Sequence, residues 1–159
     1  MKPILEQKTI EGLQWIVEIL DRKHIPYQLV GGLAAKIYGS AREVNDIDID
    51  IPEDRFDDVV DEVRPYISSG PKHLLDEKWD MDIIVLDYHG QDIELGGAYK
   101  TKIRNKENTA WIESPADLST TIQMQLEGIL VNVCPPDRMI EYKQYLNGDH
   151  QIEDIEAMR

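Results

Sequence analysis

A strict alternation of Asp and Ile from Asp46 to Ile51 constrains the fold of this chain more than any other segment. Because successive side chains of a β-strand point to opposite faces, the pattern predicts a strand with three isoleucines on one face and three carboxylates on the other. Asp46, Asp48 and Asp50 would then follow one another at about 6.6–6.8 Å. Strand interiors disfavour Asp, and neighbouring carboxylates repel one another. A hard divalent cation such as Mg²⁺, which prefers oxygen ligands, would relieve this repulsion.

Two other readings of the acidic strand stay open. The first is the solvated face of an edge strand, since the whole chain is acidic, with 31 acidic residues against 17 basic ones and a net charge of −14. The second is a calcium loop, because the three aspartates have the spacing of the first EF-hand ligands. Ile51 stands where that loop requires Gly, which argues against calcium.

Hydrophobic spacing and turn residues predict the elements around this strand. Helices are expected over 5–20, 33–38 and 53–63, from 114–115, from 136, and in a last segment that ends near 158. Further strands are expected over 27–30, 81–88, 91–95 and 130–134, with a hairpin turn at 89–90 and an irregular stretch over 96–108. This order predicts an α/β (α+β) fold in which helices flank a small mixed β-sheet. The 159 residues are expected to form a single domain, 1–159.

Composition restricts the setting and the partners. Cys134 is the only cysteine, so no disulfide framework and no thiolate zinc site are expected. The first residues do not resemble a signal peptide, and no apolar run approaches the ~20 residues of a membrane span, so a cytoplasmic location is expected. The acidic balance argues against an anionic membrane as partner and against nucleic acid held by electrostatics alone.

The pair Gly31-Gly32 follows one predicted strand and precedes a predicted helix. Such a turn lets backbone N–H groups approach a phosphate closely, although it can equally be a tight turn without a ligand. Thirteen residues separate Gly32 from Asp46, enough for one short helix and a return to the acidic strand. A phosphate cradle beside metal-binding carboxylates is the arrangement of metal-assisted phosphoryl or nucleotidyl transfer.

These two motifs together resemble the signature of the DNA polymerase β-like nucleotidyltransferase superfamily. The resemblance rests on Val30-Gly31-Gly32 followed by Asp46-Ile47-Asp48-Ile49, and it is firm from about residue 28 to 52. Within the superfamily, the chain is most similar to small bacterial antibiotic nucleotidyltransferases of the lincosamide type. The resemblance implies the nucleotidyltransferase fold and transfer of a nucleoside monophosphate from an NTP such as ATP to a hydroxyl of a small-molecule acceptor. The resemblance is also compatible with a homodimer.

The resemblance implies a role for each candidate residue. One or two Mg²⁺ ions would be held by Asp46 and Asp48. A third carboxylate on a later strand would complete the metal site and act as general base; Asp92 is the first choice, with Glu94 on the same face and Asp82 on the preceding strand as alternatives. The expected nucleotide contacts are Gly31, Gly32, Arg42 and Lys143, although Arg42 could instead pair with Glu43 or Asp50, and Lys143 could be a solvated helix residue.

Two further functions stay open. The same chemistry could act on tRNA or protein, as in toxin–antitoxin nucleotidyltransferases, and a local basic cluster at Lys100, Lys102, Arg104 and Lys106 would suit such an acceptor. The chain could also be a catalytically inactive nucleotide-binding regulatory module.

Overall fold

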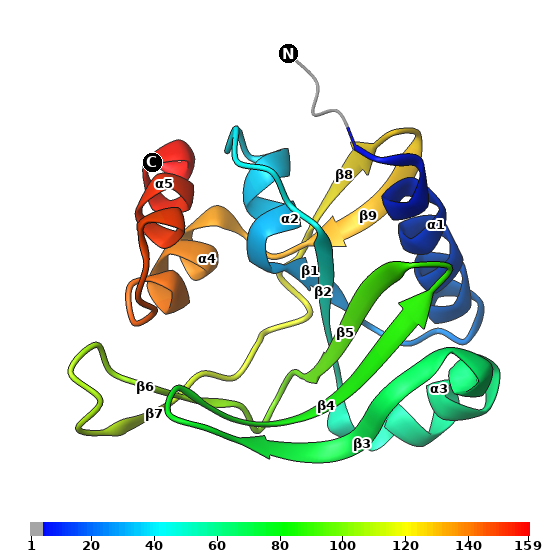
Figure 1. Ribbon diagram of the computed structural model, residues 1–159, viewed down its shortest axis with the longest axis horizontal. Helices are drawn as coiled ribbons and strands as arrows, with labels where there is room; N and C mark the ends of the chain where they lie inside the picture. Colours follow the sequence, from blue (N-terminus) through cyan, green and yellow to red (C-terminus); the bar gives the residue numbers. More distant parts are fainter. Residues whose placement is uncertain (1–4) are drawn as a thin grey trace.

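A nine-stranded mixed sheet forms the centre of the computed structural model, which describes residues 5–159 (Figure 1). The strands follow the order β7-β6-β4-β5-β2-β1-β9-β8, and β3 pairs with β4. In chain order the strands are β1 (Gln28–Val30), β2 (Asp46–Ile51), β3 (Ile67–Leu75), β4 (Trp79–Tyr88), β5 (Gln91–Gly97), β6 (Lys102–Arg104), β7 (Trp111–Glu113), β8 (Ile122–Leu126) and β9 (Ile129–Val133). The α-helices are α1 (Gln7–Arg22), α2 (Gly31–Ile37), α3 (Phe56–Val63), α4 (Pro136–Lys143) and α5 (Asp149–Met158). The predicted α/β class, with helices flanking a mixed sheet, is confirmed.

The acidic strand β2 lies inside the sheet, between β1 and β5. Its isoleucines, Ile47, Ile49 and Ile51, are almost completely buried in the core. Helix α1 packs on this apolar face, where Gly12 approaches Ile93 of β5. Full burial of each isoleucine stabilises the fold by roughly 1.5–3 kcal/mol. The edge-strand reading of β2 is therefore wrong, because strands pair with it on both sides.

Strand pairing fixes what lies beside Asp48. The antiparallel pairing of β1 with β2 places Val30, the residue before the glycine pair, opposite Asp48. The parallel pairing of β2 with β5 places Glu94 opposite Asp48 and Asp92 opposite Asp46. Paired residues share a face of a sheet. The glycine turn and a second acidic strand therefore flank Asp48 on its polar side.

The helices fall into two groups on either side of this central strand (Figure 1). One group, α1 and α3, covers the isoleucine face. The other group contains α2, α4 and α5; α2 contacts β1, β2 and both of the later helices. Among residues 5–159, no helix is long and apolar enough to cross a membrane.

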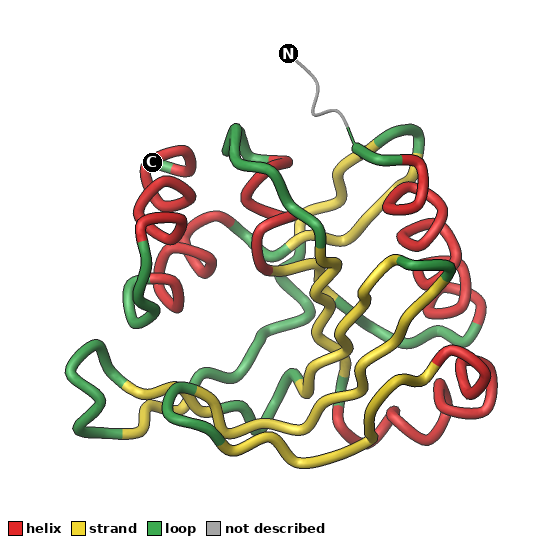
Figure 2. Tube along the Cα trace, viewed as in Figure 1, coloured by secondary structure: helices red, strands yellow, loops and turns green. Residues whose placement is uncertain are grey.

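Most predicted elements are present, but the middle of the chain differs. The helix predicted from Ser114-Pro115 is wrong: residues 114–121 form a loop between β7 and β8 (Figure 2). The N–H of Ser114 donates to the Thr101 carbonyl at 2.9 Å, and that of Ala116 to the Ala98 carbonyl at 2.7 Å, so the first part of this loop is bonded to the segment between β5 and β6 and forms no helical turn. The predicted irregular stretch also contains β6, and β3 and β8 add strands that local patterning did not predict.

Candidate active site

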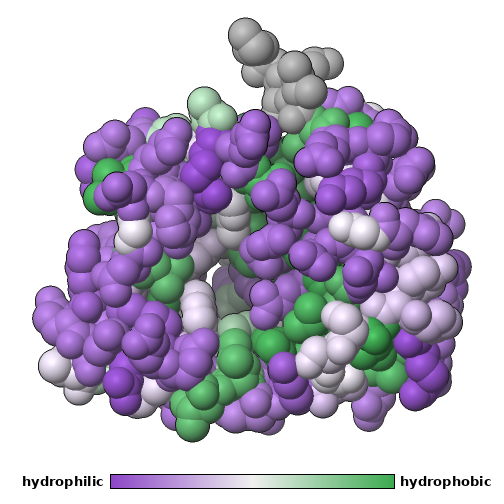
Figure 3. Space-filling view, viewed as in Figure 1, coloured by the Kyte–Doolittle hydropathy of each residue, from purple (hydrophilic) through white to green (hydrophobic). Residues whose placement is uncertain are grey.

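A cavity of about 660 Å³ opens on the polar face of β2. The space-filling view shows the molecule hollowed near its centre (Figure 3). The lining residues come from β1 to β5, the segment just before β2, the 114–117 loop and helices α2, α4 and α5. Its charged and glycine residues include Gly31, Gly32, Arg42, Asp46, Asp48, Asp50, Glu94, Arg138 and Lys143. Nearly all of the residues predicted from the sequence thus meet in one place.

The glycine pair allows the closest approach in this cavity. Gly31 has φ of +72°, a conformation that favours Gly, and a Cβ there would overlap Oδ2 of Asp48. A Cβ on Gly32 would lie 2.6 Å from Nη2 of Arg42. The pair therefore lets a carboxylate and a guanidinium lie directly against the start of α2. The N–H of Gly31 donates to Oη of Tyr142 at 2.9 Å, so a phosphate could accept from this N–H only if the hydroxyl moved away.

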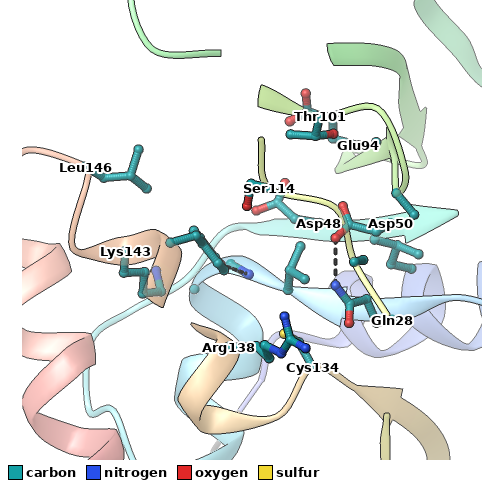
Figure 4. A pocket seen from close by; sticks show the side chains of 18 of the residues that line it. Gln28, Asp48, Asp50, Glu94, Thr101, Ser114, Cys134, Arg138, Lys143 and Leu146 are labelled. Atoms are coloured by element: carbon teal, nitrogen blue, oxygen red, sulfur yellow. Dashed lines mark hydrogen bonds between the residues drawn. The ribbon is translucent and has the colours of Figure 1, made fainter. Parts of the chain in front are cut away.

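The carboxylates of the cavity differ in exposure. Asp46 is exposed at the start of β2, whereas Asp48 and Asp50 are half-buried. Asp50 accepts a hydrogen bond from Nε2 of Gln28 at 2.9 Å (Figure 4). Glu94 is half-buried on β5 and lines the cavity, on the same side as Asp48 and Asp50. Their crowding on one wall makes the cavity strongly acidic there.

The two other candidates for the third carboxylate lie outside the cavity lining. Asp92 is exposed on β5, opposite Asp46 in the register. Asp82 lies on β4, where Oδ1 is 2.8 Å from Nδ1 of His73. The structure therefore brings Glu94 into the cavity beside Asp48, and it brings neither Asp92 nor Asp82 there.

Burial and mutual repulsion raise the pKa values of these acids. The pKa of Asp48 is raised to about 7, first by burial and then by the charges of Glu94, Asp46 and Asp50. Burial also raises the pKa of Asp50 to about 7, although the hydrogen bond from Gln28 opposes the shift. The pKa of Glu94 is raised by burial and by Asp46. A cation in the cavity would lower all three.

The carboxylate oxygens of the cavity suit a divalent cation, but they do not already surround a single metal position. Among residues 5–159, no three His, Cys, Asp or Glu side chains converge into a ready-made metal site. Within the same residues, no N–H or side-chain donor bonds to Asp48, in contrast to Asp50. Half-buried carboxylate oxygens without donors are the ligands that Mg²⁺ takes, and Mg²⁺ commonly completes its shell with water and substrate phosphates. The residues present therefore fit the predicted metal.

Two cations predicted from the sequence line the cavity. Lys143 of α4 lies across the cavity from Asp48, Asp50 and Glu94 (Figure 4), and only 3% of its surface is exposed. It is therefore a buried lining residue rather than a solvated one. Arg42 precedes β2 and donates from Nη2 to Asp154 at 2.7 Å. This partner differs from Glu43 and Asp50, the carboxylates that sequence reasoning had considered.

Sequence reasoning missed three residues of the site. Tyr142, Arg138 and the loop residue Ser114 all line the cavity. Tyr142 and Arg138 belong to α4, the helix that also carries Lys143. Arg138 and Tyr142 are four residues apart and so share one face of α4, which was the available signal, but nothing local indicates that α4 turns this face toward β2.

No family model and no curated protein sequence matches this chain. Solved structures do match it in fold. A protein of Thermotoga maritima assigned as a nucleotidyltransferase is 21% identical, with 82% of this chain and 79% of that chain covered and a TM-score of 0.68. The lincosamide antibiotic adenylyltransferase LnuA with lincomycin bound is 11% identical, with 93% and 94% covered and a TM-score of 0.61. The enzyme ANT(2″)-Ia in complex with adenylyl-2″-tobramycin is 14% identical, with 94% and 87% covered and a TM-score of 0.64.

These similarities confirm the predicted nucleotidyltransferase fold, including its likeness to the small antibiotic-modifying type. At these identities the comparison concerns the fold, and function has to be argued from the cavity itself.

Proposed function

We propose that this protein is a Mg²⁺-dependent nucleotidyltransferase that moves a nucleoside monophosphate from an NTP to a hydroxyl of a small molecule. One observation carries the proposal: the Gly31-Gly32 turn, the Asp46 and Asp48 carboxylates and Glu94 meet in one cavity through the pairing of β1, β2 and β5. The shared fold with antibiotic adenylyltransferases supports the same activity.

Asp46 and Asp48 would hold one or two Mg²⁺ ions. When bound, the metal would stabilise negative charge on the triphosphate and on the departing pyrophosphate. We assign the third carboxylate to Glu94, because it lines the cavity and pairs with Asp48 in the sheet. Asp92, in contrast, is exposed outside the cavity. Burial and the charge of Asp46 raise the pKa of Glu94, which makes its carboxylate a better proton acceptor.

The transfer itself needs a hydroxyl close to Glu94. The acceptor oxygen forms a bond to the α-phosphorus, and the bond between that phosphorus and the bridging oxygen of the pyrophosphate breaks. The Glu94 carboxylate accepts the hydroxyl proton, and pyrophosphate leaves with the electron pair of the broken bond. Arg42 and Lys143 would bind the triphosphate from the opposite wall, where two positive charges complement its negative charge.

A small-molecule acceptor fits the remaining walls. Leu74, Trp79 and Met81 supply apolar and aromatic lining, and Ser114 supplies a hydroxyl. The two antibiotic adenylyltransferases of this fold contain lincomycin and an adenylylated tobramycin. We therefore favour a hydroxyl-bearing small molecule over tRNA or protein.

Calorimetry tests the proposal most directly. The wild-type protein is titrated with each of the four NTPs, with Mg²⁺ and with EDTA. We expect at least one NTP to bind only when Mg²⁺ is present, and Asp48→Asn to abolish that binding, because it removes a ligand charge at the centre of the cavity. Metal-independent binding would indicate a regulatory module, and no binding at all would refute the proposal.

A labelled-NTP screen then identifies the acceptor class. The protein is incubated with Mg²⁺, the NTP that binds, and separate panels of hydroxyl-bearing antibiotics, tRNA and purified proteins. We expect label to move to a small molecule. Label on tRNA or on a protein would instead support the basic cluster of residues 100–106 as an acceptor surface.

A further inference from the structure

A buried carboxylate on the last helix joins the cations of the cavity. Asp154 of α5 has no exposed surface. Its Oδ1 accepts hydrogen bonds from Oγ of Ser40 at 2.8 Å and from Nε of Arg42 at 3.2 Å. Its Oδ2 lies 2.7 Å from Nη2 of Arg42 and 3.1 Å from Nζ of Lys143. One carboxylate therefore holds a guanidinium and an ammonium group from two different parts of the chain.

Arg42 and Lys143 line the cavity, whereas Asp154 does not. Arg42 lies between α2 and β2, and Lys143 is the last residue of α4. Without a shared partner, two cations this close would repel each other, and both side chains have many rotamers. Asp154 offsets this repulsion. It holds the guanidinium of Arg42 and the ammonium group of Lys143 in place at the wall of the cavity.

We propose that Asp154 is a positioning residue for triphosphate binding, which holds Arg42 and Lys143 in place on the wall opposite the acidic strand. The inference rests on the proposed nucleotidyl transfer and adds a residue that does not touch the nucleotide. It also gives α5 a part in the site, although none of the motifs on the first half of the chain points to that helix.

The charge balance of the cluster supports this role. Burial lowers the pKa of Lys143, and the charge and hydrogen bond of Asp154 oppose that shift. In return, hydrogen bonds from Arg42 and Ser40 and the charge of Lys143 lower the pKa of Asp154, although burial acts in the other direction. Asp154 therefore favours the protonated form of Lys143, and a protonated lysine is what a phosphate requires.

A purely structural role is the competing explanation. The same bonds also attach α5 to the segment that follows α2 and to α4, which packs against it. Removing one partner of a buried ionic cluster is strongly destabilising in general. The test must therefore separate loss of stability from loss of phosphate binding.

Mg²⁺-tripolyphosphate is a suitable probe, because it carries the phosphates without a base. Its dissociation constant is measured by calorimetry for wild type, Asp154→Asn and the control Glu156→Gln, which alters an exposed acid on the same helix. We expect Asp154→Asn to weaken binding at least tenfold at a temperature where the protein is folded, and Glu156→Gln to bind like wild type.

A double-mutant cycle then identifies the route of the effect. In a background with Arg42→Ala and Lys143→Met, Asp154→Asn should change the affinity less than threefold, because its two partners are gone. The same tenfold loss in that background would overturn the inference. If Asp154→Asn fails to fold, Ser40→Ala replaces it; this variant removes one hydrogen bond to Asp154 and should weaken binding at least threefold, and wild-type affinity would count against the inference.

The outcomes separate the two proposals. If wild type binds neither Mg²⁺-NTP nor Mg²⁺-tripolyphosphate, the proposed function is wrong and the inference fails with it. If wild type binds both, and folded Asp154→Asn binds them equally tightly, only the inference is wrong.

Discussion

The carboxylate of Asp48 lies where the glycine turn, the acidic strand and β5 meet. Gly31 packs against it from the start of α2, and Glu94 is its pairing partner on β5. The two neighbours affect the Asp48 carboxylate differently. The glycine allows the backbone to approach it closely, and the glutamate adds a second negative charge. Exchange of single side chains at this point therefore separates packing from charge.

Glu94 and Asp92 offer a matched comparison, because both lie on β5 and point to the same side of the sheet. We expect Glu94→Gln to lower the rate of pyrophosphate release by 10²–10⁴-fold, the usual contribution of a general base. Asp92→Asn should change the rate by less than threefold, because its carboxylate is exposed outside the cavity. The assay uses the acceptor found by the labelling screen. The opposite ranking of the two variants would assign the third carboxylate to Asp92.

The turn from β1 into α2 is the element on which the site depends. Gly31 begins a helix of only seven residues, and its backbone is left-handed. Two separate penalties would follow from a side chain here: the cost of a positive φ, and the overlap with Asp48. Gly128, in the turn between β8 and β9, shares the first penalty with φ of +79° but has open space around its Cβ position.

The comparison of Gly31 with Gly128 leads to a prediction about the turn from β1 into α2. Gly128→Ala should lower the free energy of unfolding by about 1 kcal/mol, the cost of a left-handed alanine. Gly31→Ala should lower it by about 2–4 kcal/mol, because the Asp48 side chain must also move, and it should weaken Mg²⁺-NTP binding. Urea denaturation and calorimetry measure the two effects. Equal losses of stability for both variants would show that the Asp48 contact has no energetic weight.

Local pattern predicted β2, the β4–β5 hairpin and α4 well, because a two-residue period or a helical stripe is written within a few residues. Gly31 and Asp48 could be grouped because only one short helix and a return separate their strands, whereas the third carboxylate was expected first at Asp92, with Glu94 as an alternative, because β5 joins β2 through long-range pairing. The pairings of β3, β6 and β8 could not be predicted, because they depend on partners in other parts of the chain. Ser114-Pro115 has the local marks of a helix start, yet Ala98 and Thr101 bind the backbone there. Asp154 is 112 residues from Arg42, and only the packing of α5 brings the two together.

At the scale of the whole molecule, the negative charges that make up the net charge of −14 differ in how much they cost the folded state. Exposed carboxylates on α3 face solvent, where screening makes their repulsion small. The cavity instead gathers Asp48, Asp50 and Glu94 at partly buried positions, where the same charges cost far more. The metal-free fold is therefore strained electrostatically at one place, and a bound cation would stabilise the entire molecule.

This strain predicts how stability changes with pH. The pKa of Asp48 is about 7 in the folded protein against 3.8 in the unfolded chain, so the folded state holds a proton that the unfolded state releases. Stability in EDTA should therefore fall as pH rises from about 4 to 7, by on the order of 4 kcal/mol for this group. Mg²⁺ should raise the melting temperature strongly at pH 8 and little at pH 5, because it competes with the proton.

Thermal melts of wild type, Asp48→Asn and the exposed-site control Glu107→Gln, each at pH 5 and pH 8 with Mg²⁺ or EDTA, measure this linkage. Asp48→Asn removes the charge without changing the shape of the side chain, so it should be more stable than wild type in EDTA at pH 8 and gain little from Mg²⁺. Glu107→Gln should behave like wild type, because its side chain is exposed in the loop between β6 and β7. A wild-type protein that gains equal stability from Mg²⁺ at both pH values would show that the ion binds away from the acidic strand. Such a result would also remove the physical basis for placing the metal at Asp46 and Asp48, since a cation held by these carboxylates must displace the proton on Asp48.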